Sequence, residues 1–308
     1  MITAPQPIPY QGSKRKQVPI ILGYIPSDTE TLYEPFAGSA AVTIGAAASN
    51  SARRFSISDS LKPLTEIWTL IVEAPDLLSD EYSRIWEAQL ADPRAYFDQV
   101  RLEFNQQRQP AQLLYLLARC VKNAIRFNSN GEFNQSPDNR RLGMKPALLR
   151  ERVNQVHALL AQRAEVWCGD YLSALEDASP KDVVYMDPPY VGVSGVRDQR
   201  YHQQLDYERF VLALAKANSR QVSYLVSFDG RCGDKEYGPG LPDSLGLSKI
   251  DVHVGRSSQA TLAGREEETV ESLYLSPALM DRLSAHKVRM NPTADIRKHT
   301  KTQQLSLA

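Results

Sequence analysis

The stretch Val183-Val184-Tyr185-Met186-Asp187-Pro188-Pro189-Tyr190 is the most informative part of this chain of 308 residues. An apolar run that ends in a proline pair predicts a buried strand that stops abruptly, with a carboxylate and an aromatic ring at its carboxyl end. Ligands bind at the carboxyl ends of the strands in open α/β sheets. The stretch therefore predicts an α/β sheet and also the place of its site.

These residue types suit the recognition of a flat ring that carries an amine. Asp187 can accept a hydrogen bond, Pro188 offers a backbone carbonyl of restricted direction, and Tyr190 supplies a face for stacking. Two acceptors on the amine hydrogens can turn the nitrogen lone pair out of the ring plane. A proline-rich turn beside a surface tyrosine is the plain alternative, and the functional interpretation is the favoured one.

The composition, 42% hydrophobic and 23% charged, is that of an ordinary soluble globular protein, and no apolar run is long enough to span a bilayer. The amino terminus does not resemble a secretion signal. Three widely separated cysteines, Cys120, Cys168 and Cys232, favour reduced thiols in the cytoplasm and show no zinc-binding spacing, so we expect no metal. The net charge is zero, so contact with nucleic acid would need a local basic patch such as residues 120–163.

The first third of the chain has the order strand, tight turn, helix, strand. We predict strands at residues 31–36 and 55–58, an alanine-rich helix to about residue 49, and a helix over 62–73. A turn containing Gly38 after one strand and an acid, Asp59, at the tip of the next is the arrangement that binds adenosine cofactors. Only Gly38 of a G-x-G-x-x-G motif is present, which disfavours a nicotinamide cofactor.

The middle of the chain, from residue 76 to about 163, lacks a βαβ rhythm and is predicted to be a mainly helical insertion. Within it, Asn130-Gly131 is a strong hairpin signal. Strands are predicted again at 165–168, 183–186, 222–227 and 271–275, with a helix over 207–217. Residues 255–258 have the composition of a polar loop, and the stretch from about residue 286 that of a frayed tail.

Five segments, in order, resemble motifs of the DNA adenine-N6 methyltransferases of the Dam type. They are Pro9-Tyr10-Gln11-Gly12-Ser13-Lys14, Glu34-Pro35-Phe36-Ala37-Gly38-Ser39-Ala40 with Asp59, the hairpin Asn123 to Asn134, Cys168-Gly169-Asp170-Tyr171, and Asp187 to Tyr190. The resemblance implies an α/β fold with a Rossmann-like S-adenosylmethionine-dependent methyltransferase sheet and an inserted, mainly helical target-recognition subdomain. The implied catalytic domain comprises residues 1–75 and 165–280, the subdomain with its hairpin 76–164, and a polar tail 281–308.

The resemblance also implies roles for individual residues, with S-adenosyl-L-methionine as cofactor and double-stranded DNA as partner. The catalytic residues would be Asp187, Pro188, Pro189 and Tyr190. The cofactor-binding residues would be Tyr10, Gly12, Lys14, Pro35, Phe36, Gly38, Asp59, Asp170, Tyr171 and Asp187. The DNA-binding residues would be Asn123, Arg126, Asn128 and Asn134, with Arg140, Arg141 and Lys145 on phosphates. Taken alone, Asp59 and Asp170 could be helix N-caps, and Tyr10 and Lys14 an exposed turn.

The chain departs from the family pattern at several positions. Ser13 and Ala40 replace glycines, Leu61 replaces an asparagine, and Pro9 replaces the base-reading lysine of GATC-methylating members. The implied target is therefore not GATC. A cytosine amine or a protein glutamine amide is an alternative substrate, a DNA-binding regulator without turnover is an alternative function, and a cognate restriction endonuclease is a possible partner.

Overall fold

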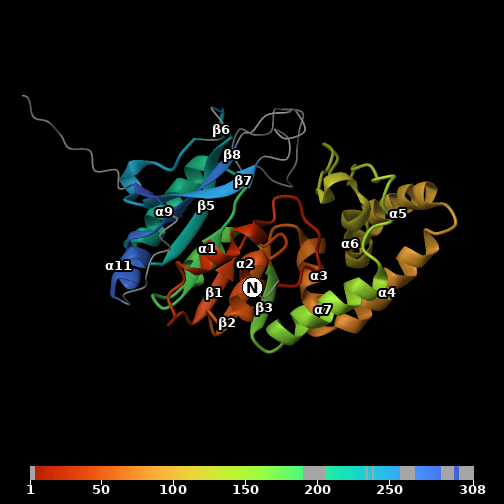
Figure 1. The fold of residues 1–308 in the computed structure, drawn as a ribbon, viewed down its shortest axis with the longest axis horizontal. Coiled ribbons are helices and arrows are strands. Elements are labelled where there is room, and N and C mark those ends of the chain that lie inside the picture. The colour runs from red at the N-terminus through yellow and green to blue at the C-terminus, as the bar shows by residue number, and fades with distance from the viewer. Residues whose placement is uncertain are drawn as a thin grey trace, which may run out of the picture.

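The computed structural model describes residues 4–189, 205–232, 235–237, 239–256, 268–285 and 295–297. Its centre is one mixed sheet in the order β3-β2-β1-β4-β5-β8-β7-β9, with β6 paired to β5 (Figure 1). The strands are β1 Thr31–Glu34, β2 Arg54–Asp59, β3 Ala164–Cys168, β4 Val183–Met186, β5 Tyr224–Cys232, β6 Lys235–Tyr237, β7 Ser248–Arg256, β8 Glu268–Leu275 and β9 Asp295–Arg297. The five strands from β3 to β5 are parallel, and β8 runs antiparallel between β5 and β7.

The sheet is covered by helices on both faces. Val183 and Tyr185 of β4 belong to one hydrophobic core, and the alternate residues Val184 and Met186 belong to the other. The helices that contribute to the first core include α1 Val18–Leu22, α2 Ala41–Ala48, α3 Lys62–Glu73 and α11 Pro277–Ala285; α8 Tyr171–Asp177 and α9 Tyr207–Ser219 contribute to the second. Burial on both faces explains why β4 is a continuous apolar run and confirms the predicted Rossmann-like sheet.

Four further helices lie together beyond α3 at one end of the molecule (Figure 1). They are α4 Pro75–Ala88, α5 Pro93–Gln107, α6 Pro110–Arg119 and α7 Pro146–Leu160. Each begins with proline, whose fixed φ suits the first helical position and whose missing N–H needs no partner there. Proline thus marks the start of each of these four helices, in a region whose sequence does not alternate between strand and helix patterns.

Most of the predicted strands and helices are present, with shifted ends, and three segments differ from expectation. Gly255 and Arg256, predicted to be loop, end strand β7, while Ser257 and Ser258 lie outside the described residues. Residues 295–297 of the predicted tail form β9 and pair with β7. Helix α11, Pro277–Ala285, was not predicted and includes residues 281–285 of the polar tail expected at 281–308. Strand β7 was missed although Ile250, Val252 and Val254 alternate with polar residues, which is the pattern of a half-buried strand.

The order of the strands fixes where a ligand can bind. The chain passes from β1 to β2 and β3 on one side and returns to β4 and β5 on the other, so β1 and β4 are neighbours at the reversal. The crevice outside the carboxyl ends of such strands is the binding site of open α/β sheets. No helix within the described part of the chain is long and apolar enough to cross a membrane.

Candidate active site

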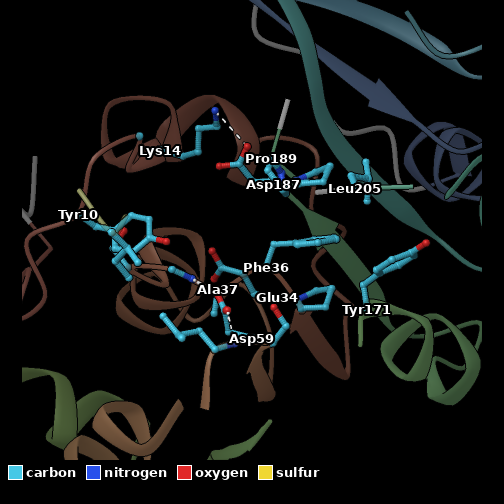
Figure 2. A pocket seen from close by; sticks show the side chains of 18 of the residues that line it. Tyr10, Lys14, Glu34, Phe36, Ala37, Asp59, Tyr171, Asp187, Pro189 and Leu205 are labelled. Atoms are coloured by element: carbon cyan, nitrogen blue, oxygen red, sulfur yellow. Dashed lines mark hydrogen bonds and ion pairs between the residues drawn. The ribbon is translucent and has the colours of Figure 1, made fainter. Parts of the chain in front are cut away.

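A pocket opens at the carboxyl ends of β1, β2, β3 and β4 (Figure 2). It brings together every residue expected to bind the cofactor and three of the four residues expected to act in catalysis. Its lining includes Tyr10, Gly12, Lys14, Pro35, Phe36, Gly38, Asp59, Asp170, Tyr171, Asp187, Pro188 and Pro189. Tyr190, the fourth catalytic candidate, lies outside the described residues.

The loop after β1 forms one wall of the pocket and is held by the buried carboxylate of Glu34. Glu34 accepts a hydrogen bond of 2.8 Å from the backbone N–H of Thr43 and so fixes the start of α2. Burial raises the pKa of Glu34 to about 7, although hydrogen bonds from the helix lower it. Ala40 precedes α2 with φ +43°, a left-handed conformation that favours glycine, which explains why glycine is frequent at this position.

Asp59, at the tip of β2, faces this loop. Its two carboxylate oxygens accept hydrogen bonds from the backbone N–H groups of Gly38, at 3.2 Å, and Leu61, at 3.0 Å. The indole N–H of the buried Trp68 donates to the carbonyl of Gly38 at 3.0 Å and holds the loop from below. These two hydrogen bonds fix the rotamer of Asp59, so its carboxylate lies along the wall of the pocket.

The amino-terminal segment closes the opposite side of the pocket. A Cβ added to Gly38, whose φ is +49°, would lie 3.1 Å from Cε1 of Tyr10, so the tyrosine ring sits directly on this glycine. The hydroxyl of Ser39 donates to that of Ser13 at 2.8 Å. Ser13, which stands where the family pattern has glycine, thus ties the two loops together.

The buried side chain of Lys14, in the 3-10 helix Lys14–Lys16, is shared between two carboxylates. Its Nζ lies 3.2 Å from Oδ1 of Asp187 and 2.7 Å from Oε2 of Glu271 on β8. Burial raises the pKa of Asp187 to about 6; Lys14 lowers it and Glu271 raises it. With Glu34 nearby, the pocket holds more acidic than basic groups, which suits a cationic ligand.

Residues after β3 form the far end of the pocket. Asp170 caps α8 by accepting from the N–H of Leu172 at 3.0 Å, and its other oxygen lies 3.0 Å from a guanidinium nitrogen of Arg209. The rings of Phe36 and Tyr171 stack with centroids 5.3 Å apart. Asp170 is thus an N-cap and a pocket residue at once, so the two alternatives for it are compatible.

The predicted hairpin is present beside the pocket as an irregular turn structure. It has isolated bridges between Phe127 and Phe133 and between Cys120 and Pro137. Asn105 of α5 donates from its side chain to the carbonyl of Phe133 at 3.1 Å and accepts from its N–H at 2.7 Å, as a neighbouring strand would. The guanidinium of Arg108 donates to the carbonyl of Gly131 at 2.6 Å. Helix α5 therefore supports the hairpin tip.

Two of the asparagines expected to contact DNA bond to their own chain. Asn128 accepts from the N–H groups of Asn130 and Glu132, each at 2.9 Å, and so shapes the turn. Asn123 donates to the carbonyl of Leu117 at 2.8 Å, and its own carbonyl accepts from the N–H of Gln11 at 2.9 Å. Asn123 thus links the hairpin to the pocket.

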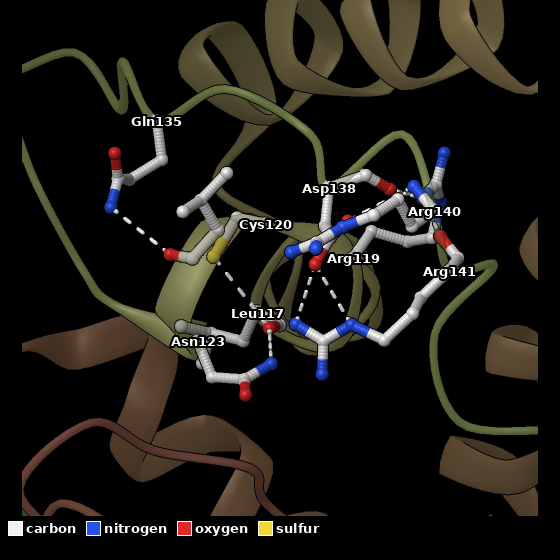
Figure 3. Close-up of polar contacts among 9 residues, drawn as sticks. Leu117, Arg119, Cys120, Asn123, Gln135, Asp138, Arg140 and Arg141 are labelled. Atoms are coloured by element: carbon white, nitrogen blue, oxygen red, sulfur yellow. Dashed lines mark hydrogen bonds and ion pairs between the residues drawn. The ribbon is translucent and has the colours of Figure 1, made fainter. Parts of the chain in front are cut away.

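The remaining DNA-binding candidates are accessible to different degrees. Asn134, Arg140, Arg141 and Lys145 are exposed, and Arg126 is partly buried. Asp138 orders two of them, because its carboxylate lies 2.8 Å from Nε and from a terminal nitrogen of Arg141 and 3.5 Å from Nε of Arg140 (Figure 3). The backbone N–H of Arg140, which donates to Oδ1 of Asp138 at 3.0 Å, and then the hydrogen bond from the Arg141 side chain lower the pKa of Asp138.

Arg119, at the end of α6, lies beneath this arginine loop, residues 138–141 (Figure 3). Its side chain is only 2% exposed and donates to the carbonyls of Asp138, at 2.8 Å, and of Arg141. It also donates to the carbonyl of Pro93 at 3.2 Å. A buried guanidinium with these partners fixes the path of the loop that carries Arg140 and Arg141.

Sequence reasoning missed several residues of the site, and only some of them carried a signal. Glu34 stands inside the recognised cofactor loop, so its place was indicated. Arg119 also carried a signal, because it is a charged residue at the end of an otherwise mostly apolar helix. Glu271 carried no signal, because it follows Asp187 by more than eighty residues and reaches the pocket only through the antiparallel insertion of β8.

Comparison with known proteins agrees with this geometry. Residues 10–237 match the family described as D12 class N6 adenine-specific DNA methyltransferase. The chain is 28% identical over 279 residues to a DNA adenine methylase of Salmonella typhi, covering 86% of this chain and 93% of that protein. It is 25% identical over 230 residues to the DNA adenine methylase of Haemophilus influenzae, covering 71% of this chain and 77% of that protein. It is 26% identical over 232 residues to a DNA N-6-adenine-methyltransferase of Escherichia phage P1, covering 72% of this chain but only 29% of the phage protein.

Proposed function

Because the chain belongs to the D12 class of N6 adenine-specific DNA methyltransferases, we propose that its pocket binds S-adenosyl-L-methionine and an adenine extruded from double-stranded DNA. The observation that carries this proposal is the single pocket that joins the cofactor loop, Asp59 and Asp187. The family assignment favours adenine over the alternatives of a cytosine amine or a glutamine amide.

The residues present fit the cofactor. Asp59 offers acceptors for ribose hydroxyls, and Leu61 and Ile125 add apolar surface to the pocket for the adenine. Five acids line the pocket, Glu34, Asp59, Asp170, Asp187 and Asp206, and they outnumber the bases Lys14 and Arg209, so the pocket suits a ligand with a positive sulfur and a positive amine. When bound, S-adenosyl-L-methionine supplies an electrophilic methyl group on that sulfur.

The chain's own residues orient the acceptor. The carboxylate of Asp187 and the carbonyl of Pro188 accept the two hydrogens of the adenine amine, so the nitrogen lone pair turns out of the ring plane. As the nitrogen gains the methyl group, the bond between methyl carbon and sulfur would break to leave a neutral thioether, and one amine proton would pass through the hydrogen-bonded carboxylate of Asp187 to water. Such alignment of two bound reactants can contribute about 7–11 kcal/mol to catalysis. Tyr190, which follows in the sequence, stacks on the extruded base and offsets part of the cost of a few kcal/mol for extrusion.

We assign residues 1–75 and 165–280 to the catalytic domain and 76–164 to the target-recognition subdomain. The hairpin belongs to the subdomain. Asn123 connects it to the catalytic domain, because the carbonyl of Asn123 accepts a hydrogen bond from the N–H of Gln11. The target is a sequence other than GATC, since Pro9 lacks a side-chain donor. We place the enzyme in the cytoplasm, as a solitary methylase or with a cognate restriction endonuclease.

Transfer of a labelled methyl group tests this function. The protein is incubated with S-adenosyl-L-methionine labelled in the methyl group and with mixed plasmid DNA, and the nucleosides are separated. Label in N6-methyladenine supports the proposal. DNA that is bound but not labelled would identify the chain as a regulator without turnover, and label in cytosine would refute the adenine assignment.

Replacing Gly38 by alanine is expected to weaken cofactor binding about tenfold, a change of about 1.4 kcal/mol. The added Cβ displaces the Tyr10 ring, and the left-handed φ of +49° costs about 1–2 kcal/mol for a residue other than glycine. Calorimetric titration with the cofactor measures the change. Gly131→Ala is the matched control, because its φ is +73° but no described atom lies within 4 Å of the new Cβ. An unchanged affinity in Gly38→Ala would place the cofactor elsewhere.

Two arginine substitutions should separate base reading from phosphate binding. Arg126→Ala is expected to cost about 1–3 kcal/mol on the cognate site and to relax discrimination, whereas Arg141→Ala should weaken binding to every duplex and reduce the salt slope by about one. Binding isotherms on cognate and scrambled duplexes at several salt concentrations measure both. Arg53→Ala is the control, because this exposed arginine directly precedes β2 and so lies at the amino ends of the parallel strands, away from the pocket. Equal losses on all sequences for both variants would refute this division.

A further inference from the structure

Glu271 is a partly buried acid that the mechanism above does not use, although it lies within the same ion-pair network as the catalytic carboxylate. It stands on β8, opposite Gly230 of β5 and Val252 of β7. Its Oε2 accepts from Nζ of Lys14 at 2.7 Å and from Nε2 of Gln17 at 2.9 Å. The side chain is 19% exposed, so water screens these contacts only in part.

Lys14 joins the two acids. Its ammonium is 7% exposed and lies 3.2 Å from Asp187, which is farther than its 2.7 Å contact with Glu271. The ammonium of Lys14 therefore contacts both carboxylates. A positive charge near Asp187 favours its ionised form, and a negative charge disfavours it. The net effect on Asp187 therefore depends on whether Glu271 is present and ionised beside Lys14.

We propose that Glu271 is a positioning residue for methyl transfer: it holds the ammonium of Lys14 and withholds part of its charge from Asp187. The carboxylate of Asp187 thereby stays basic enough to accept a hydrogen bond from the adenine amine and does not form a tight ion pair with Lys14. The proposal rests on the proposed function, since it takes Asp187 as the group that orients the amine.

The direction of the effect follows from the charges that face Asp187. These are Lys14 from the 3-10 helix, Glu271 from β8, Glu34 from β1 and Tyr185 from β4. Glu271 raises the pKa of Asp187, and Lys14 lowers it. Removing the negative charge of Glu271 should therefore lower the pKa of Asp187 by about one unit, the size of effect that one nearby charge has.

Titration by NMR tests the proposal without cofactor or DNA. The carboxyl carbons of aspartate and glutamate are labelled with ¹³C, and Asp187→Asn identifies the resonance of Asp187. In Glu271→Gln the inflection of Asp187 should move to lower pH, while Glu176→Gln should leave it unchanged. Glu176 is the matched control because it pairs with Lys216 at 2.8 Å on the exposed surface. An inflection that stays in place or moves to higher pH would overturn the proposal.

Two further measurements complete the test. In the wild-type protein, which needs no substitution, Asp187 and Glu271 should titrate as a coupled pair whose curves share two inflections, and independent single-step curves would overturn the proposal. In single-turnover methylation, the acid limb of the pH–rate profile should move to lower pH in Glu271→Gln and stay in Glu176→Gln. If the wild type transfers no methyl group, the proposed function fails, whereas the NMR titrations still decide the role of Glu271.

Discussion

Asp187→Ala should reduce the rate of methyl transfer by at least about 10²–10³-fold, the loss that follows removal of one oriented polar group from a catalytic site. The carboxylate is one of only two acceptors proposed for the adenine amine, and Lys14 has already placed it at the carboxyl end of β4. Without it the lone pair stays conjugated with the ring. Single-turnover methylation at saturating cofactor and DNA measures the loss.

The same variant should retain its fold and bind the cofactor, because the pocket keeps Asp59, Gly38 and the aromatic pair Phe36–Tyr171. Asp281→Ala, on the exposed face of α11, provides a control with the same substitution at a distance. Full activity in Asp187→Ala would disprove the mechanism. Loss of cofactor binding together with activity would assign Asp187 to the cofactor and not to the amine.

The sequence predicts the sheet and most of its pocket because these depend on local patterns. Strand β4 is apolar on both faces, and its end at Asp187-Pro188 is marked by the residues that stop it. Asp59 and Gly38 follow their strands directly, so parallel pairing of β1 and β2 is enough to bring them together. Motifs at strand ends are therefore visible in the sequence and stay together in the fold.

Residues that reach the site through distant pairing were not predictable. Glu271 acts at the pocket only because β8 turns back between β5 and β7, and no spacing in the sequence reports that insertion. Strand β7, by contrast, did carry a local signal, because Ile250 and Val252, both buried in the core, alternate with polar residues. Asn123 and Asn128, predicted to contact DNA, also bond to nearby backbone, a structural role that the sequence alone does not show. Their contact with DNA stays a prediction.

Arg119→Met should weaken binding to every DNA sequence by about tenfold or more and lower the free energy of unfolding by about 3 kcal/mol, since hydrogen bonds to charged groups contribute about 1.5–3 kcal/mol each. The methionine fills similar space but leaves the carbonyls of Pro93, Asp138 and Arg141 without the guanidinium. The arginine loop then loses its fixed path, and Arg140 and Arg141 no longer meet the phosphates together.

Duplex binding at several salt concentrations, urea unfolding and cofactor titration separate these effects. Cofactor affinity should not change, because Arg119 does not line the pocket. Arg101→Met is the matched control: it removes one hydrogen bond of 3.3 Å to the carbonyl of Gln135 and a partly exposed ion pair with Asp98, so its losses should be much smaller. If Arg119→Met lost stability but bound DNA with unchanged affinity and salt slope, the loop of residues 138–141 would not be a phosphate-binding element, and the basic patch would be a solvated face.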